Sequence, residues 1–156
     1  MNKYYIFIAL IISAAIFYSC DEDTEDVIAN PQDQIPSMSA DVNGTEWKAD
    51  AFAGLDTAGL VTITGTKTGD NTFVSIIFEN DIQEQSYDLA DTTSGVIALY
   101  NGLNRSSSGN VTVSNYNTTL NLVSGTFEFE TDSTIVSSTP YSVTNGVFTN
   151  VKIVSQ

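Results

Sequence analysis

The 156-residue chain has no histidine, one cysteine, and only 5 lysine and arginine residues against 19 aspartate and glutamate residues. Without histidine it lacks the commonest general base and the commonest metal ligand. A single cysteine excludes an intrachain disulfide framework and a multi-cysteine zinc site. The net charge of −14 argues against nucleic-acid binding, which needs a basic surface to displace phosphate counterions. We therefore expect no metal, no other cofactor, no nucleic-acid partner and no enzymatic activity.

Long apolar runs are absent except at the N-terminus, where the mostly apolar residues 4–18 follow Lys3 and precede Ser19-Cys20. This run is short for a spanning helix, which needs about 20 apolar residues, and it is typical of a secretory signal peptide. Its end resembles the lipobox of bacterial lipoproteins, in which a small residue precedes the lipidated cysteine. We expect residues 1–19 to be removed and Cys20 to carry an acyl anchor in the membrane. Ordinary cleavage, or an uncleaved N-terminal anchor with an incidental Cys20, are the alternatives.

Residues 20–36 form the next segment, in which DEDTED (21–26) carries five acidic side chains in six positions. Dense like charge resists packing, and two prolines extend the irregular stretch, so we expect a disordered tether. The acidic run also resembles the surface-export signal of Bacteroidota lipoproteins, although it is equally compatible with a solvated tail. The expected localisation is the cell envelope, at the outer membrane, with cell-surface exposure if the run is an export signal.

Residues 37–156 have the composition of an all-β domain. Threonine, serine and asparagine supply 49 of the 156 residues, which favours strands and turns over helices. Alternation places Phe127 and Phe129 on one strand face and Glu128 and Glu130 on the other. The segment FVSIIF (73–78) is apolar on both faces and predicts a central strand covered on both sides. We predict one antiparallel β-sandwich or small barrel of about eight to nine strands.

Turn residues separate these runs. Asn43-Gly44 predicts a hairpin, and residues 68–71 and Asn101-Gly102 predict further turns. Asn145-Gly146 interrupts an apolar run and predicts either a hairpin turn or a bulge.

Three blocks resemble small Bacteroidota lipoproteins of unknown function. The blocks are DVNGTEWKA (41–49), SGTFEF (124–129) and VTNGVF (143–148). The resemblance covers roughly residues 38–154 and implies a compact β domain on an exported lipoprotein. It implies no catalytic residues.

Five aromatic residues are candidate contacts with a ligand or partner: Trp47, Tyr87, Tyr100, Tyr116 and Tyr141. The tyrosines lie near turns or strand ends, where rings could stack on sugars while acids and asparagines bind hydroxyls. Alternatively, Trp47 fills the core beside the first hairpin, and each tyrosine packs its ring with the hydroxyl at the rim.

Two pairs of carboxylate side chains are the remaining candidates for catalytic residues. Glu128 and Glu130 are about 7 Å apart on one strand face, near the spacing used in glycoside hydrolysis, and Asp88 with Asp91 is a second pair. A solvated outer face explains both pairs without catalysis.

The leading hypothesis is a membrane-anchored, non-enzymatic binding or structural module whose partner is a protein or a glycan. The first alternative is a lipocalin-like carrier with a cavity lined by residues such as Phe73, Phe78 and Phe127. The second alternative is a carboxylate-dependent glycoside hydrolase with Glu128 or Glu130 in a concave site.

Overall fold

A computed structural model describes residues 34–79, 81–132 and 139–156. The predicted signal peptide, Cys20 and nearly all of the acidic tether lie outside the described residues. The described residues form ten strands: β1 (Ser37–Val42), β2 (Thr45–Lys48), β3 (Ala51–Thr57), β4 (Leu60–Lys67), β5 (Thr72–Phe78), β6 (Ser86–Asp88), β7 (Val96–Tyr100), β8 (Asn104–Asn117), β9 (Leu122–Thr131) and β10 (Ser142–Ser155). They contain no helix, and so none that could cross a membrane. The all-β prediction is confirmed.

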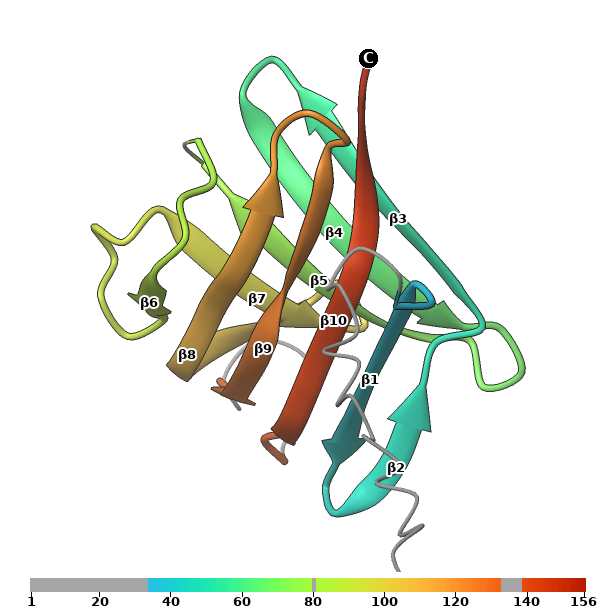
Figure 1. Cartoon of the computed structure of the whole chain (residues 1–156). Helices are drawn as coiled ribbons and strands as arrows, with labels where there is room; N and C mark the ends of the chain where they lie inside the picture. Colours follow the sequence, from blue (N-terminus) through green and yellow to red (C-terminus); the bar gives the residue numbers. More distant parts are fainter. Residues whose placement is uncertain (1–33, 80, 133–138) are drawn as a thin grey trace, which may run out of the picture.

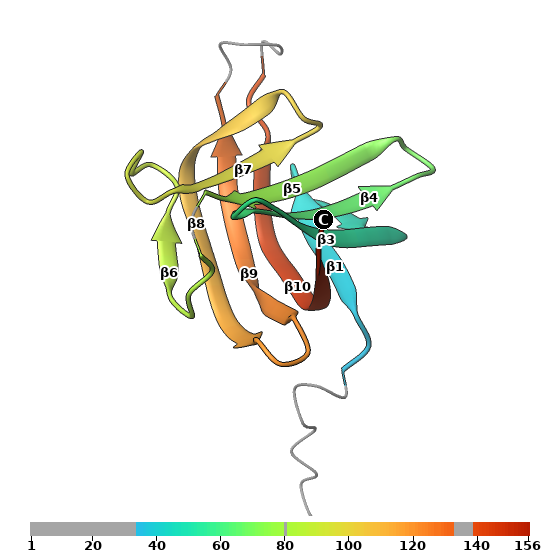
Figure 2. The same cartoon turned by 90° about the horizontal axis from the view of Figure 1, so that it is seen from above.

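Seven of these strands close into a barrel in the order β10-β3-β4-β5-β7-β8-β9, and β9 pairs back to β10. Figure 1 shows β1, β10, β9 and β8 as the nearer layer and β3, β4, β5 and β7 behind them. In the view from above, the strands of the two layers cross steeply (Figure 2). The extra strands β1 and β2 extend the first layer beyond β10, and β6 extends it beyond β8.

One pairing departs from the antiparallel prediction. The end of β10 runs parallel to β3, with Ile153 opposite Gly54 and Ser155 opposite Asp56. A parallel pair needs a long connection between its strands. Most of the chain separates β3 from β10, so this requirement is met and the last strand can close the ring.

The interior of the ring is filled with side chains. Ile63, Val74 and Ile76 from the second layer and Val123 and Phe148 from the first are fully buried. Two of the phenylalanines expected to line a carrier cavity belong to this core. Phe78 packs edge-on against Tyr87, with ring centroids 5.5 Å apart, and Phe127 packs between Phe129 and Phe148.

Two of the three Asn-Gly pairs make tight turns, and the third makes a bulge. Asn43 and Gly44 both have positive φ (50° and 76°), as a type I′ hairpin turn requires. Asn101 and Gly102 also have positive φ and begin the short loop between β7 and β8, in which Tyr100 pairs with Asn104. At Asn145-Gly146 the strand β10 continues, and its register with β9 shifts between Val143 and Gly146. A side chain at Gly146 would collide with Phe127, so the bulge needs glycine there.

The prediction that FVSIIF is covered on both faces is wrong for the described residues. Val74, Ile76 and Phe78 are buried in the core, whereas Phe73 and Ile77 on the outer face are only half-buried. No second layer covers the outer face of β5 among the described residues, so the apolar side chains on that face stay partly exposed.

Candidate functional site

A hollow of about 300 Å³ lies where the β1–β2 turn, the β4–β5 turn and the end of β7 meet. We call it the aromatic hollow. Its lining includes Trp47 from β2, Tyr100 at the end of β7 and Tyr141 just before β10. The rest of the lining is Val42, Asn43, Thr45, Glu46, Lys67, Asp70 and Thr72. It thus combines three aromatic rings with amide, hydroxyl and charged groups.

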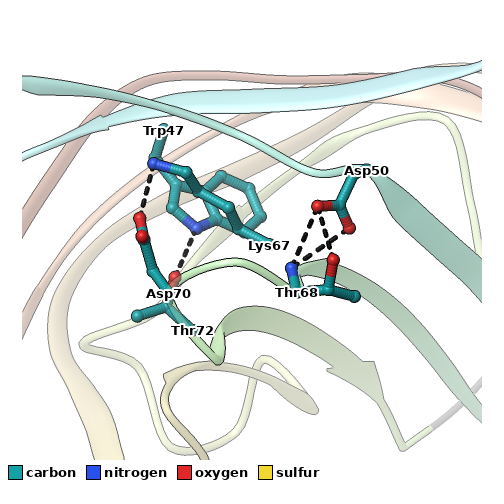
Figure 3. A network of polar contacts seen from close by, with 6 residues as sticks. All are labelled: Trp47, Asp50, Lys67, Thr68, Asp70 and Thr72. Carbon is teal, nitrogen blue, oxygen red and sulfur yellow. Dashed lines mark hydrogen bonds and ion pairs between the residues drawn. The ribbon is translucent and has the colours of Figure 1, made fainter.

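Trp47 and Tyr100 form the base of the hollow. Their exposed fractions are 3% and 6%, and the Trp47 Nε1–H donates to Thr72 Oγ1 at 3.0 Å (Figure 3). The Tyr100 ring lies against that of Tyr141, with centroids 4.7 Å apart. Tyr141 is half-buried and is therefore the aromatic residue with the most surface left for a ligand.

Burial raises the pKa of the Tyr100 phenol, because desolvation penalises the phenolate, and hydrogen bonds with Thr72 and Asn101 oppose this rise. Tyr100 is therefore a neutral phenol at physiological pH, and its hydroxyl is engaged with Thr72 and Asn101.

The charged rim of the hollow is organised by the β4–β5 turn. Lys67 Nζ lies 2.6 Å from Asp70 Oδ2, and this contact raises the Lys67 pKa. Asp50 accepts hydrogen bonds from the Thr68 N–H (3.1 Å) and hydroxyl (2.7 Å), which lower its pKa. Figure 3 shows both contacts holding the turn beside Trp47. The rim is therefore held in place by its own hydrogen bonds and ion pair.

The structure places the other two predicted aromatic contacts elsewhere. Tyr87 is buried, and its hydroxyl donates to the Gln83 carbonyl oxygen (3.1 Å) and accepts from the Gln83 N–H (2.9 Å). Tyr116 lines a separate hollow of about 570 Å³ together with Asp56, Asp81 and Glu84. Its backbone N–H donates to Glu84 Oε1 at 2.7 Å. Sequence reasoning thus identified three residues of the aromatic hollow and two that lie outside it.

The carboxylate pairs lack the environment of an acid–base couple. Glu128 and Glu130 are exposed on the outer face of β9, beside a shallow hollow of about 230 Å³. Asp88 accepts from the Ala90 N–H, and Asp91 accepts from the N–H and hydroxyl of Thr93, which lower the Asp91 pKa. Asp88 and Asp91 therefore cap local turns. Within the described ranges, no cluster of three or more acidic or cysteine side chains could hold a metal ion.

Sequence reasoning missed the polar members of the aromatic hollow, including Asn43, Lys67 and Asp70. Asn43 and Asp70 occupy turns that the sequence did predict, and Lys67 is the last residue of β4, directly before the second of these turns. Nothing in a single sequence says that the 43–44 and 68–71 turns lie beside each other and beside the end of β7, because tertiary pairing brings them together.

Comparison with known proteins gives one match. The family model described as Domain of unknown function (DUF6252) matches residues 34–152, which includes all but the last few residues of the described domain. No curated protein and no solved structure matches the chain.

Proposed function

Since the chain belongs to this family of unknown function, we propose its role from the site itself: a lipid-anchored cell-envelope protein whose β domain binds a neutral glycan without catalysis. The observation that carries the proposal is the aromatic hollow. Binding sites combine apolar and aromatic walls with a few placed polar groups, and here Tyr141 stands beside Asn43, Glu46 and Asp70. Carboxylate and amide oxygens of this kind accept hydrogen bonds from hydroxyl groups.

Charge supports a neutral ligand. Residues 37–156 carry 13 acidic and 4 basic side chains, a net charge of −9 that disfavours acidic polymers. Of the charged side chains that line the hollow, Glu46 and Asp70 are acidic, and the basic Lys67 is already paired with Asp70.

The position of the hollow suits a tethered protein. The Asn150 Nδ2–H donates to the Gln34 carbonyl oxygen at 2.8 Å, which fixes the chain to β10 just before β1 begins at Ser37. The aromatic hollow starts at Val42, where β1 ends. Six strand residues span about 17–20 Å, so the site and the point where the tether joins lie at opposite ends of β1. An anchor at Cys20 would leave the hollow free to face away from the membrane.

The two alternative functions receive less support. A lipocalin-like carrier needs an internal cavity, and Phe78 and Phe127 are packed in the core instead. A glycoside hydrolase needs its two carboxyl groups to flank a bound sugar in a site that encloses it, and Glu128 and Glu130 are exposed on the outer face of β9 instead.

The test is affinity electrophoresis of the full chain in gels that contain a neutral polysaccharide such as mannan, xylan or β-glucan. We expect at least one polysaccharide to retard the protein, and Tyr141→Ala to weaken the retardation about tenfold. Tyr116→Ala is the matched control, because Tyr116 is a half-buried tyrosine in a different hollow. Equal losses in the two variants, or no retardation by any of the polysaccharides, would contradict glycan binding at the aromatic hollow.

A further inference from the structure

Tyr141, the half-buried aromatic residue of the hollow, lies one residue before β10, yet both polar groups of its backbone are hydrogen-bonded. Thr131, the last residue of β9, donates its backbone N–H to the Tyr141 carbonyl oxygen at 2.9 Å. The Tyr141 N–H in turn donates to the side-chain Oγ1 of Thr131 at 2.8 Å. In an antiparallel ladder such an N–H ordinarily donates to a backbone carbonyl oxygen. Here a side-chain hydroxyl completes the pairing between the end of β9 and the residue before β10.

Asn43 holds the next residue, Ser142, in the same two-point manner. The Asn43 Oδ1 accepts from the Ser142 N–H at 2.9 Å, and the Asn43 N–H donates to the Ser142 carbonyl oxygen at 2.8 Å. Asn43 belongs to the β1–β2 turn. Figure 1 shows this turn, the end of β9 and the start of β10 together at one end of the molecule. We call Thr131 and Asn43 the Tyr141 clamp, because they hold two successive residues from two different elements.

Core packing alone does not account for threonine at position 131. Its exposed fraction is 3%, and a buried hydroxyl costs free energy unless it is hydrogen-bonded. Valine has nearly the same shape and would fill the same space without a polar group. Among the described residues of β9, Thr131 is the one buried polar residue, the other buried ones being Val123, Gly125, Phe127 and Phe129. The hydroxyl therefore serves the contact with Tyr141.

The clamp also determines where the Tyr141 ring lies. Once the backbone of a residue is fixed, its side chain has only a few allowed rotamers. The Tyr141 ring lies against that of Tyr100, with centroids 4.7 Å apart and planes at 52°, and Tyr100 is itself buried. Contacts within the protein therefore fix both the backbone and the ring of the residue that offers most aromatic surface to the hollow.

We propose, on the basis of the proposed glycan site, that Thr131 and Asn43 are positioning residues that hold the Tyr141 ring ready to stack on a sugar. A site whose contact residue is already ordered loses less conformational entropy on binding than one that must order it. Asn43 also lines the aromatic hollow, whereas Thr131 is not one of the described residues that line it. Thr131 therefore acts on the ligand only through Tyr141, and it separates positioning from direct contact.

Thr131→Val tests the clamp, because it removes the hydroxyl and keeps the shape of the side chain. In affinity electrophoresis of the full chain with mannan, xylan or β-glucan, the polysaccharide that retards the wild type should retard Thr131→Val about fivefold more weakly. Thr131→Ser keeps the hydroxyl and should restore the retardation. Ser106→Ala is the matched control, since the buried Ser106 Oγ likewise accepts a backbone N–H, that of Ala98 at 3.2 Å. It should be retarded like the wild type.

Amide hydrogen exchange, followed by NMR, gives a second readout that needs no ligand. In Thr131→Val the Tyr141 amide should exchange at least about tenfold faster than in the wild type, because its acceptor is lost. The amide of Ile76, in β5, should stay protected, which shows that the variant is folded.

Other results would overturn the proposal. Equal retardation of Thr131→Val and the wild type, or an unchanged exchange rate at Tyr141, would mean that Tyr141 keeps its place without the hydroxyl. Equal weakening in Thr131→Ser or in Ser106→Ala would mean that general stability, and not this hydroxyl, determines binding. Absence of wild-type retardation would instead contradict the glycan site and with it the role of Thr131 in binding, while the exchange rate would still show whether Thr131 holds Tyr141.

Discussion

Tyr100 shows how one aromatic side chain can belong both to a core and to a site. Its exposed fraction is 6%, so the ring is packed, yet the same ring forms the base of the aromatic hollow against Tyr141. Trp47 has the same double position and satisfies its indole N–H with Thr72. The two sequence hypotheses for these residues, ligand contact and core packing, are compatible at this place because the site lies at the edge of the core.

Burial of Tyr100 predicts a loss of stability at alkaline pH. Its folded pKa lies above the ordinary value of 10.0, so the unfolded chain gives up the proton first as pH rises. The stabilisation it contributes is complete below pH 10.0 and is lost as pH rises through the folded pKa. Urea unfolding from neutral to alkaline pH should show the free energy of unfolding of Tyr100→Phe falling less steeply than that of the wild type. Parallel curves would contradict this role.

The local sequence pattern specifies which segments form strands. The strands that pair with or pack on each segment decide whether it turns, bulges or is covered. All three Asn-Gly pairs carry the same local turn signal. Two become hairpin turns, whereas the third lies inside β10, because both flanks of that strand go on pairing with β9. The β5 strand is a second example. Its apolar pattern correctly predicts a strand, but it wrongly predicts that a second layer covers the outer face of that strand.

Close packing of β8, β9 and β10 predicts that Gly125 is irreplaceable. A Cβ atom at this position would collide with the Thr112 carbonyl oxygen and the Phe148 ring, and backbone cannot move aside cheaply. Gly125→Ala should lower the free energy of unfolding by at least about 2 kcal/mol, measured by urea denaturation. Gly69→Ala is the control. No atom lies within 4 Å of the place that its Cβ would take, so a change within about 0.5 kcal/mol is expected. A neutral Gly125→Ala would show that the three strands can separate.

At the scale of the whole molecule, the acidic charge is unevenly distributed. Residues 21–33 hold six of the 19 acidic side chains and no basic one, and residues 37–156 have a net charge of −9. We infer that the acidic surface keeps the domain apart from anionic polymers.

The proposed anchor gives a prediction for the whole chain. Metabolic labelling with a palmitate analogue should label the wild-type protein and leave Cys20→Ala unlabelled, because Cys20 is the only thiol. Ser155→Ala is a control substitution near the other end of the sequence and should keep the label. Equal labelling of wild type and Cys20→Ala would exclude lipidation at Cys20.

The sequence by itself determined that the domain is built of strands, where most turns lie, and which side of each strand enters the core, as for Phe127 and Phe129. Those properties depend on period-two alternation and on the backbone preferences of Asn and Gly, which are local. Only the tertiary structure decided that seven strands close into a ring and that β10 meets β3 in parallel. It also decided that Trp47, Tyr100 and Tyr141 share a hollow with Lys67 and Asp70. These are contacts between residues 20 to about 100 positions apart, and no local preference encodes them.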